Sequence, residues 1–278
     1  MNFEKELNII LKNLNEKKYE KVIHKCKNLI ELKLDNSIIY NIYGLALQSL
    51  RNYKGSIEAF KKSIKLQKNN LVAMNNLAVS LKATFNYEYA EKMYAECLKI
   101  NPDYISAIIN YANLKRELNN YDGAIKLYLK SLKYEKNSNK LQIYFNLAEL
   151  YRIIGDFKNA NIYAQKIVNE SPNNVYGHKL LSEFIDYEKD DKHLLQLENI
   201  FNKTNLKIVE KIELAFVIGK AYEKIKNYET AFKYFKIGND LKKTIVKYNY
   251  SDHLKLHNSL ITFFKNINLE KINKKKIN

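Results

Sequence analysis

Apolar and small residues recur along this chain at intervals of three and four, and lysine, glutamate and asparagine fill most positions between them. This spacing places the apolar side chains on one face of a helix and the polar side chains on the other. The 278 residues include only 7 glycines and 2 prolines, too few for the many tight turns of a β-sandwich or barrel. The pattern predicts an all-α protein with short connections.

The helices are arranged in an internal repeat. An Asn or Asp followed by an aromatic residue begins at Asn52, Asn86, Asn120, Asp156 and Asn227, with a spacing of 34 residues between the first three. In all five units a small residue lies three positions after the aromatic residue. A second small residue lies nine positions before the aromatic residue. Small residues let two helices approach closely, and the Asn or Asp can cap the second helix. Because one helix pair cannot bury its own apolar face, neighbouring pairs are expected to stack.

The order of small, aromatic and proline positions resembles the tetratricopeptide repeat, in which Pro102 and Pro172 would both end a unit. The resemblance implies a right-handed superhelical solenoid of stacked antiparallel helix pairs. It gives full units at 37–70, 71–104, 105–138, 141–174 and 212–245. The expected organisation is a degenerate first repeat at 1–36, four repeats over 37–174, a degenerate repeat at 175–211, a repeat at 212–245, a capping helix at 246–267, and a basic tail or truncated linker at 268–278.

A second resemblance covers residues 214–250, which contain the segment Gly219-Lys220-Ala221-Tyr222 and, further on, Gly238-Asn239. These residues resemble the last repeat of bacterial proteins that join such repeats to a sulfotransferase domain. The glycine-rich loop that holds the sulfate donor in that family has no counterpart here, and no Walker-type loop occurs. The resemblance implies a truncated reading frame, one half of a split pair, or a stand-alone relative, and no catalytic activity for this chain alone.

Other catalytic or metal-binding patterns are weak. His253 and His257 could share a helix face, but no glutamate lies between them as in a zinc protease, and no third ligand is evident. His24, His178 and His193 are isolated and have no nucleophile nearby in sequence. We therefore expect no catalytic residue, no cofactor and no metal site.

Asparagine occupies the sixth position of three consecutive units, as Asn76, Asn110 and Asn146. A side-chain amide donates and accepts hydrogen bonds at once, so a column of amides could hold an extended peptide backbone without reading its sequence. The repeat domains of O-linked N-acetylglucosamine transferases resemble this arrangement. Asn113 is assigned to the same groove. The alternative is that asparagine is simply common at this position.

The twelfth position of the four units holds Gln48, Lys82, Arg116 and Arg152. Arginine forms forked contacts to carboxylates that lysine cannot form. With the asparagine column, this position predicts an extended protein or peptide ligand that is acidic or carries carboxylates. The alternative is an ordinary solvated helix face.

The net charge of +17 comes from 47 basic and 30 acidic residues, and only three of the basic residues are arginine. Lysines are spread over nearly every predicted helix and tryptophan is absent, so we expect only weak, salt-sensitive binding to nucleic acid and no specific nucleic-acid partner. No apolar run reaches the ~18–20 residues of a membrane span. The charged start of the sequence indicates a cytoplasmic protein, and Cys26 and Cys97 are interpreted as buried structural thiols.

Three functions fit these observations. The first is a scaffold that binds an extended segment of a partner protein in the groove of its first helices. The second is the substrate-presenting region of a sulfotransferase whose catalytic domain is truncated or encoded separately. The third is a self-associating scaffold, which sedimentation of the purified chain would test. The fold does not decide among them.

Overall fold

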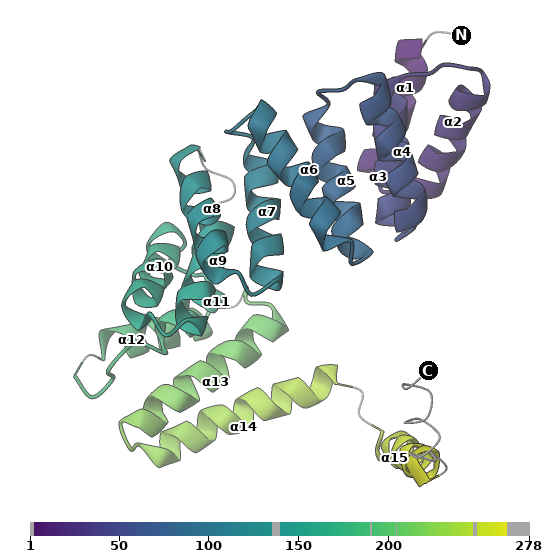
Figure 1. Cartoon of the computed structure of the whole chain (residues 1–278). Helices are drawn as coiled ribbons and strands as arrows, with labels where there is room; N and C mark the ends of the chain where they lie inside the picture. Colours follow the sequence, from purple (N-terminus) through teal and green to yellow (C-terminus); the bar gives the residue numbers. More distant parts are fainter. Residues whose placement is uncertain (1–2, 135–139, 190, 204, 247–248, 266–278) are drawn as a thin grey trace. The chain divides into compact units, whose positions relative to one another are not determined.

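The computed structural model (Figure 1) describes residues 3–134, 140–189, 191–203, 205–246 and 249–265. Within these residues the chain forms fifteen α-helices and no strand, which confirms the prediction of an all-α protein. The helices belong to two compact units, Met1–Pro172 and Asn173–Asn278, called unit 1 and unit 2 below. Residues 268–278, expected to be a basic tail or linker, lie outside the described residues.

Unit 1 is a stack of helix pairs. Its helices are α1 (Phe3–Asn15), α2 (Tyr19–Glu31), α3 (Ser37–Ser49), α4 (Tyr53–Leu66), α5 (Leu71–Ala83), α6 (Tyr87–Ile100), α7 (Ile105–Glu117), α8 (Tyr121–Tyr134), α9 (Lys140–Ile153) and α10 (Phe157–Glu170). Each odd-numbered helix packs against the even-numbered helix that follows it, and each even-numbered helix up to α8 packs against the next pair. The first helices α3, α5 and α7 also contact one another in order, so their outer surfaces form a continuous face.

Unit 2 contains α11 (Val175–Leu181), α12 (Lys192–Phe201), α13 (Ile208–Lys224), α14 (Tyr228–Ile245) and α15 (Tyr250–Lys265). Its core gathers Leu197, Leu214 and Ile218, among others. The helices α11 and α12, of 7 and 10 residues, are shorter than the 13 or 14 residues of the helices in unit 1. The helix α15 buries none of its residues.

The small residues of the repeat lie where helices come closest. A Cβ atom on Gly44 of α3 would come within 2.6 Å of the ring of Phe60 on α4, and one on Gly219 of α13 would come within 2.6 Å of Phe235 on α14. Ala78 and Ala112 take the same place in their pairs and are fully buried. A large side chain at this position would hold the two helices of a pair apart.

Most of the second helices are capped as the sequence predicts. Backbone N–H groups donate to the side chains of Asn52, Asn120, Asp156 and Asn227, from Gly55 (3.0 Å), Gly123 (2.9 Å), Asn159 (3.1 Å) and Thr230 (3.2 Å) respectively. These bonds satisfy N–H groups that the first turn of a helix leaves without a partner.

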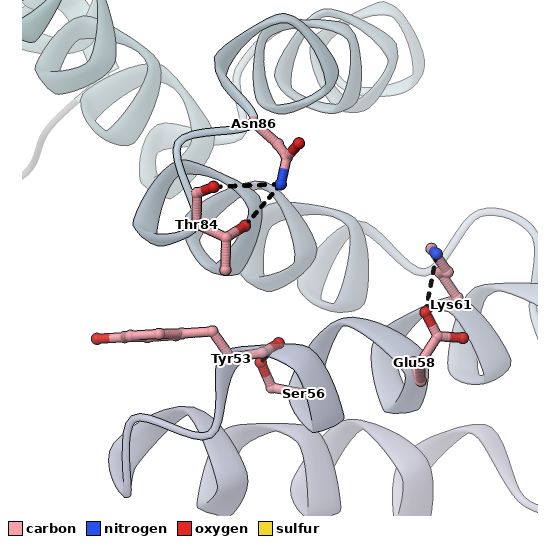
Figure 2. A network of polar contacts seen from close by, with 6 residues as sticks. All are labelled: Tyr53, Ser56, Glu58, Lys61, Thr84 and Asn86. Carbon is pink, nitrogen blue, oxygen red and sulfur yellow. Dashed lines mark hydrogen bonds and ion pairs between the residues drawn. The ribbon is translucent and has the colours of Figure 1, made fainter. Parts of the chain in front are cut away.

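The expected cap is wrong for Asn86, the residue before α6. Its amide nitrogen instead donates to Thr84, to the carbonyl oxygen at 3.3 Å and to the hydroxyl at 2.9 Å, as Figure 2 shows. The third residue of α6 is Tyr89, at the position of Gly55 and Gly123. Asn159 and Thr230 occupy this position in two units whose caps are formed, so a side chain there does not by itself prevent the cap.

Both cysteines are buried and free, as the sequence predicts. Burial raises the pKa of the Cys26 thiol to about 12 and that of the Cys97 thiol to about 11. A thiol that keeps its proton is a poor nucleophile and a poor metal ligand, so both residues act as small core side chains.

Candidate functional site

Four asparagine side chains form a hydrogen-bonded run across the first helices of unit 1. On α5, the Asn76 amide nitrogen donates to Asn41 Oδ1 of α3 at 3.4 Å, and Asn75 donates to Asn76 Oδ1 at 3.4 Å. Asn110 of α7 then donates to Asn75 Oδ1 at 3.0 Å. This amide run (Asn41, Asn76, Asn75 and Asn110) connects α3, α5 and α7. It joins Asn76 and Asn110, two of the three asparagines that the sequence singles out.

The internal bonds of the amide run differ in length. A strong N–H···O bond has its heavy atoms about 2.9–3.0 Å apart, so the two bonds of 3.4 Å at Asn76 are weak. Asn76 and Asn110 are half-buried, whereas Asn75 is buried at 6% exposure. The free protein therefore holds these amides in place, and a ligand that offered better-placed backbone groups could replace the weak bonds at small cost.

Asn146 of α9 has a different environment. It is only 7% exposed, and its Oδ1 accepts from the Arg116 guanidinium at 3.3 Å and from the Gln142 amide at 3.3 Å. The bond from Arg116 connects α7 to α9, the bond from Gln142 lies within α9, and the described contacts do not join Asn146 to the amide run. Asn146 therefore helps to hold the first helices α7 and α9 together.

Asn113 is also engaged inside the protein. Its Oδ1 accepts from the Tyr128 hydroxyl of α8 at 2.5 Å. Burial raises the pKa of Tyr128 to about 12, so this hydroxyl keeps its proton and stays a donor at neutral pH. One side of the Asn113 amide is thus used to hold α7 against α8.

The twelfth-position residues have unequal electrostatic surroundings. Lys82 forms an ion pair with Glu117 at 2.6 Å, and Arg152 forms one with Glu149 at 2.7 Å. In the described parts of the chain, Arg116 forms no ion pair with a carboxylate. Its guanidinium has five N–H donors, of which one bonds to Asn146. Arg116 is thus the cation of this column best able to receive a carboxylate from a ligand.

Gln48 of α3 holds the backbone of α5 at Asn76. Its Nε2 donates to the backbone carbonyl of Asn76 at 3.1 Å and to the Ser80 hydroxyl at 2.7 Å. Ser80 in turn shares a hydrogen bond of 2.8 Å with Ser56 of α4. These contacts tie α3, α4 and α5 together beneath Asn76.

Asn41 and Asn75, the other two members of the amide run, were not predicted from the sequence. A signal was present, since Asn41 and Asn75 lie 34 residues apart, both at the fifth position of their units. The ion pair of Lys82 with Glu117 was also missed, because a contact between neighbouring units depends on how those units are stacked. The ion pair of Arg152 had a local signal, since Glu149 lies three residues earlier on the same helix.

Two buried histidines in unit 2 are not isolated, contrary to the expectation from the sequence. His178 Nδ1 and His193 Nε2 share a hydrogen bond of 3.0 Å, and His193 Nδ1 shares one of 2.8 Å with the Tyr187 hydroxyl. All three side chains are buried. This polar cluster joins α11, the connection after it and α12, so we assign it to the packing of unit 2.

Neither a metal cluster nor a membrane-spanning helix occurs in the part of the chain that the structure describes. Within it, no three or more His, Cys, Asp and Glu residues are arranged to hold a metal ion, so His253 and His257 are not part of such a group. No described helix combines the length and the apolar character needed to cross a membrane.

Family models described as tetratricopeptide repeat match residues 38–70, 70–101, 105–138 and 141–174. These matches coincide with the four units that the sequence places at 37–174. No curated protein sequence is significantly similar to this chain.

Several solved structures share the fold. A tetratricopeptide repeat protein from Parabacteroides merdae is 16% identical, with a TM-score of 0.57, covering 91% of this chain and 96% of that one. The C-terminal part of a repeat-containing protein from Cytophaga hutchinsonii is 15% identical, with a TM-score of 0.68, covering 86% and 96%. YrrB, described as a tetratricopeptide repeat protein with an unusual peptide-binding site, is 18% identical, with a TM-score of 0.53, covering 67% and 94%.

Proposed function

We propose that this protein is a scaffold that binds an extended segment of a partner protein along the first helices α3, α5 and α7 of unit 1, within the region that matches tetratricopeptide repeat models. The amide run is the observation that carries the proposal. It spans three helices, its members are oriented by one another, and two of its bonds are long enough to be exchanged for ligand bonds.

In this proposal the two half-buried amides bind the ligand backbone. Asn76 and Asn110 each offer a carbonyl oxygen and an NH₂ group, which match the N–H and C=O of an extended peptide. Because such bonds do not depend on side chains, the amides supply affinity with little sequence preference. Asn146 and Asn113, whose oxygens are used inside the protein, are left out of the contact surface.

In this proposal, Arg116 is the residue that favours an acidic ligand. Lys82 and Arg152 are already paired with carboxylates, so they add little attraction for an acidic peptide. Arg116 has N–H donors directed at no carboxylate of the described chain and can form a forked contact with an Asp or Glu side chain or a chain terminus. The proposed ligand is thus an extended segment with a carboxylate beside Arg116.

The fold relationship to YrrB gives this proposal some support, since the description of that protein includes a peptide-binding site. At 18% identity, the similarity to YrrB shows a shared fold and nothing about the binding residues. The residues that bind the ligand must therefore be argued from this chain.

The experiment selects peptides from a displayed library of random 16-residue sequences against the full chain. Each enriched peptide is then measured against the double variant Asn76→Ala/Asn110→Ala and against Arg116→Lys. We expect a loss of affinity of about tenfold or more for the double variant, since each lost bidentate contact removes about 1 kcal/mol. Arg116→Lys keeps the charge but loses the forked geometry, so it should weaken only peptides with a carboxylate.

The matched control is Asn161→Ala/Asn169→Ala, which removes two exposed asparagines from α10 of the same unit. It should leave the affinities unchanged. If the control and Asn76→Ala/Asn110→Ala bind every enriched peptide as the wild type does, the amide run is not the binding surface.

A second candidate function rests on residues 214–250, which resemble the repeat region of bacterial sulfotransferases. Of these residues, 214–224 belong to α13 and 228–245 form α14. In this reading the chain presents substrate to a sulfotransferase domain encoded separately or downstream. Sequencing the DNA after codon 278 tests it, because a glycine-rich donor-binding loop must follow in frame or in the adjacent gene. A downstream region without such a loop contradicts it.

A further inference from the structure

A second surface of unit 1, on the side of the second helices, has properties that the amide run does not explain. An open groove with a volume of about 690 Å³ lies between α4 and α6, with α5 beneath. Its apolar lining includes Ile57, Ile64, Leu77, Leu81, Tyr89 and Met93. We call it the α4–α6 groove.

The floor of the α4–α6 groove is continuous with the protein core. Leu77 is 4% exposed and belongs to the cluster with Ile57 and Phe60. Ile64 and Met93 are partly buried and pack against that cluster and the next one along the stack. An apolar side chain inserted here would therefore extend an existing core, and the flexible Met93 can adjust to its shape.

The turn at one end of the groove departs from the other units. In each of the five full repeats the residue two positions before the second helix has a positive φ. In four of these repeats the residue is Arg51, Asn119, Gly155 or Lys226. In the α5–α6 turn it is Phe85, with φ 62° and a side chain that is 78% exposed. Bulky residues are rare in this left-handed conformation because Cβ is crowded there.

Two more departures occur in the same turn. Tyr89 is 61% exposed at a position that holds Gly55, Gly123, Asn159 or Thr230 in the other full units. Asn86 does not cap α6, unlike its four equivalents (Figure 2). Tyr89 and Asn86 both line the groove. The Phe85 ring does not line the groove and lies edge-to-face with Tyr87, 6.1 Å between ring centroids. An unfavourable backbone position and an absent cap thus coincide in the turn next to an apolar groove that Tyr89 lines, which indicates a function other than stability.

One lysine of the groove lining forms no ion pair, and the chain as a whole is basic. Lys61 and Lys68 line it from α4 and the connection after it, and Glu96 lines it from α6. Lys61 is paired with Glu58 at 2.9 Å (Figure 2), whereas Lys68 forms no ion pair with any described residue. With a net charge of +17 for the chain, association with an acidic partner is favoured over association with a second copy.

We propose that the α4–α6 groove docks an amphipathic helix of an acidic partner protein. The helix would place apolar side chains over Leu81 and Met93, with a carboxylate on the edge that faces Lys68. Phe85 and Tyr89 would cover one end of it as rigid aromatic contacts. This site is independent of the proposed function, because it lies on the second helices and requires a helical ligand.

The test uses the same displayed library of random 16-residue peptides, selected against the full chain. One class of enriched peptides is expected to carry Leu, Ile, Met or Phe at i, i+4 and i+7 with Asp or Glu beside them. These peptides should lose at least tenfold in affinity for Phe85→Asn and for Tyr89→Gly, and should bind Asn76→Ala/Asn110→Ala normally. Both substitutions place a residue found at the equivalent position of another unit, so the fold is retained.

The matched control is Phe232→Asn, which removes an aromatic ring of similar exposure from α14 in unit 2. It should leave the affinity of these peptides unchanged. The proposal is overturned if no class with this pattern is enriched, or if its members bind Phe85→Asn and Tyr89→Gly as tightly as the wild type. Peptides that respond only to Asn76→Ala/Asn110→Ala would support the amide run and contradict the groove.

Discussion

The two surfaces of unit 1 use opposite chemistry. On the first helices, amides from α3, α5 and α7 bond to one another in a run that follows the repeat from unit to unit. On the second helices, the α4–α6 groove is apolar and lies beside a turn that breaks three rules of the repeat. The first surface repeats along the stack, whereas the second occurs at one place, between two neighbouring repeats. A repeated surface suits an extended ligand, and a single groove suits one short helix.

The two surfaces also differ in what they contribute to stability. The amides bond to one another in the free protein, so they add to stability as well as to the proposed binding. Phe85 and Asn86 instead reduce stability, since one has an unfavourable φ and the other leaves a helix end without its cap. Substitutions can test whether these roles belong to these residues.

The largest expected effect comes from the floor of the groove. Leu77→Ala should lower the free energy of unfolding of unit 1 by about 2–4 kcal/mol, because a nearly fully buried leucine is replaced by a cavity. Urea unfolding followed by far-UV circular dichroism measures it. Leu254→Ala on α15, which is exposed, serves as the control and should change stability by less than about 0.5 kcal/mol. A small loss for Leu77→Ala would show that the groove floor is not part of the core.

The next effect distinguishes the asparagines of the first helices. Asn146→Ala should destabilise the protein by about 1–3 kcal/mol, since it removes a buried acceptor from Arg116 and Gln142. Asn76→Ala should cost less than about 1 kcal/mol, because that side chain is half-buried and its bonds to other asparagines are long. Equal losses in urea unfolding would contradict the assignment of Asn146 to packing and of Asn76 to the ligand.

A smaller effect, of opposite sign, is expected in the α5–α6 turn. Phe85→Asn should stabilise the protein by about 1 kcal/mol, because asparagine tolerates a positive φ better than phenylalanine. The midpoint of thermal unfolding measures the change. Lys226→Asn, at the equivalent position in unit 2, is the control and should change stability less. A destabilised Phe85→Asn variant would mean that the ring contributes to the fold and is not retained for binding.

The smallest effect concerns the one carboxylate among the caps of the second helices. Hydrogen bonds from the side chain and backbone of Asn159 hold the pKa of Asp156 below its ordinary value. The contribution of this carboxylate to stability is thus present above the pKa of the unfolded chain and is lost as the pH falls through the lower, folded value. Stability measured from pH 7 to pH 2 should show a slightly steeper acid loss for the wild type than for Asp156→Asn. Parallel curves would contradict the cap's role.

Much of the fold could be predicted because the repeat depends on residues close together in the sequence. Gly44, Ala78 and Ala112 mark close helix contacts in the sequence itself, and the structure places each of them in the core. The helix pair α11–α12 was harder, because its packing relies on His178, His193 and Tyr187, which differ from every other unit. A repeat pattern cannot reveal a polar cluster that occurs once.

The candidate site was predictable only in part. The asparagine column gave Asn76 and Asn110, but Asn75 and Asn41 bond to them through the stacking of units, which sequence spacing alone does not show. Lys82 resembles a ligand-binding cation in the sequence, but stacking brings Glu117 of the next unit to it. The α4–α6 groove had no sequence signal of its own, because a groove is the space that neighbouring helices leave between them.

The central claim is that the amide run binds an extended peptide. The most direct measurement is a nuclear magnetic resonance titration of the full chain, labelled with ¹⁵N at asparagine side chains, with a peptide enriched by the library selection. The account predicts that the NH₂ signals of Asn76 and Asn110 shift on binding while that of the exposed Asn169 on α10 stays in place. A peptide that binds tightly and leaves the Asn76 and Asn110 signals unchanged would contradict it.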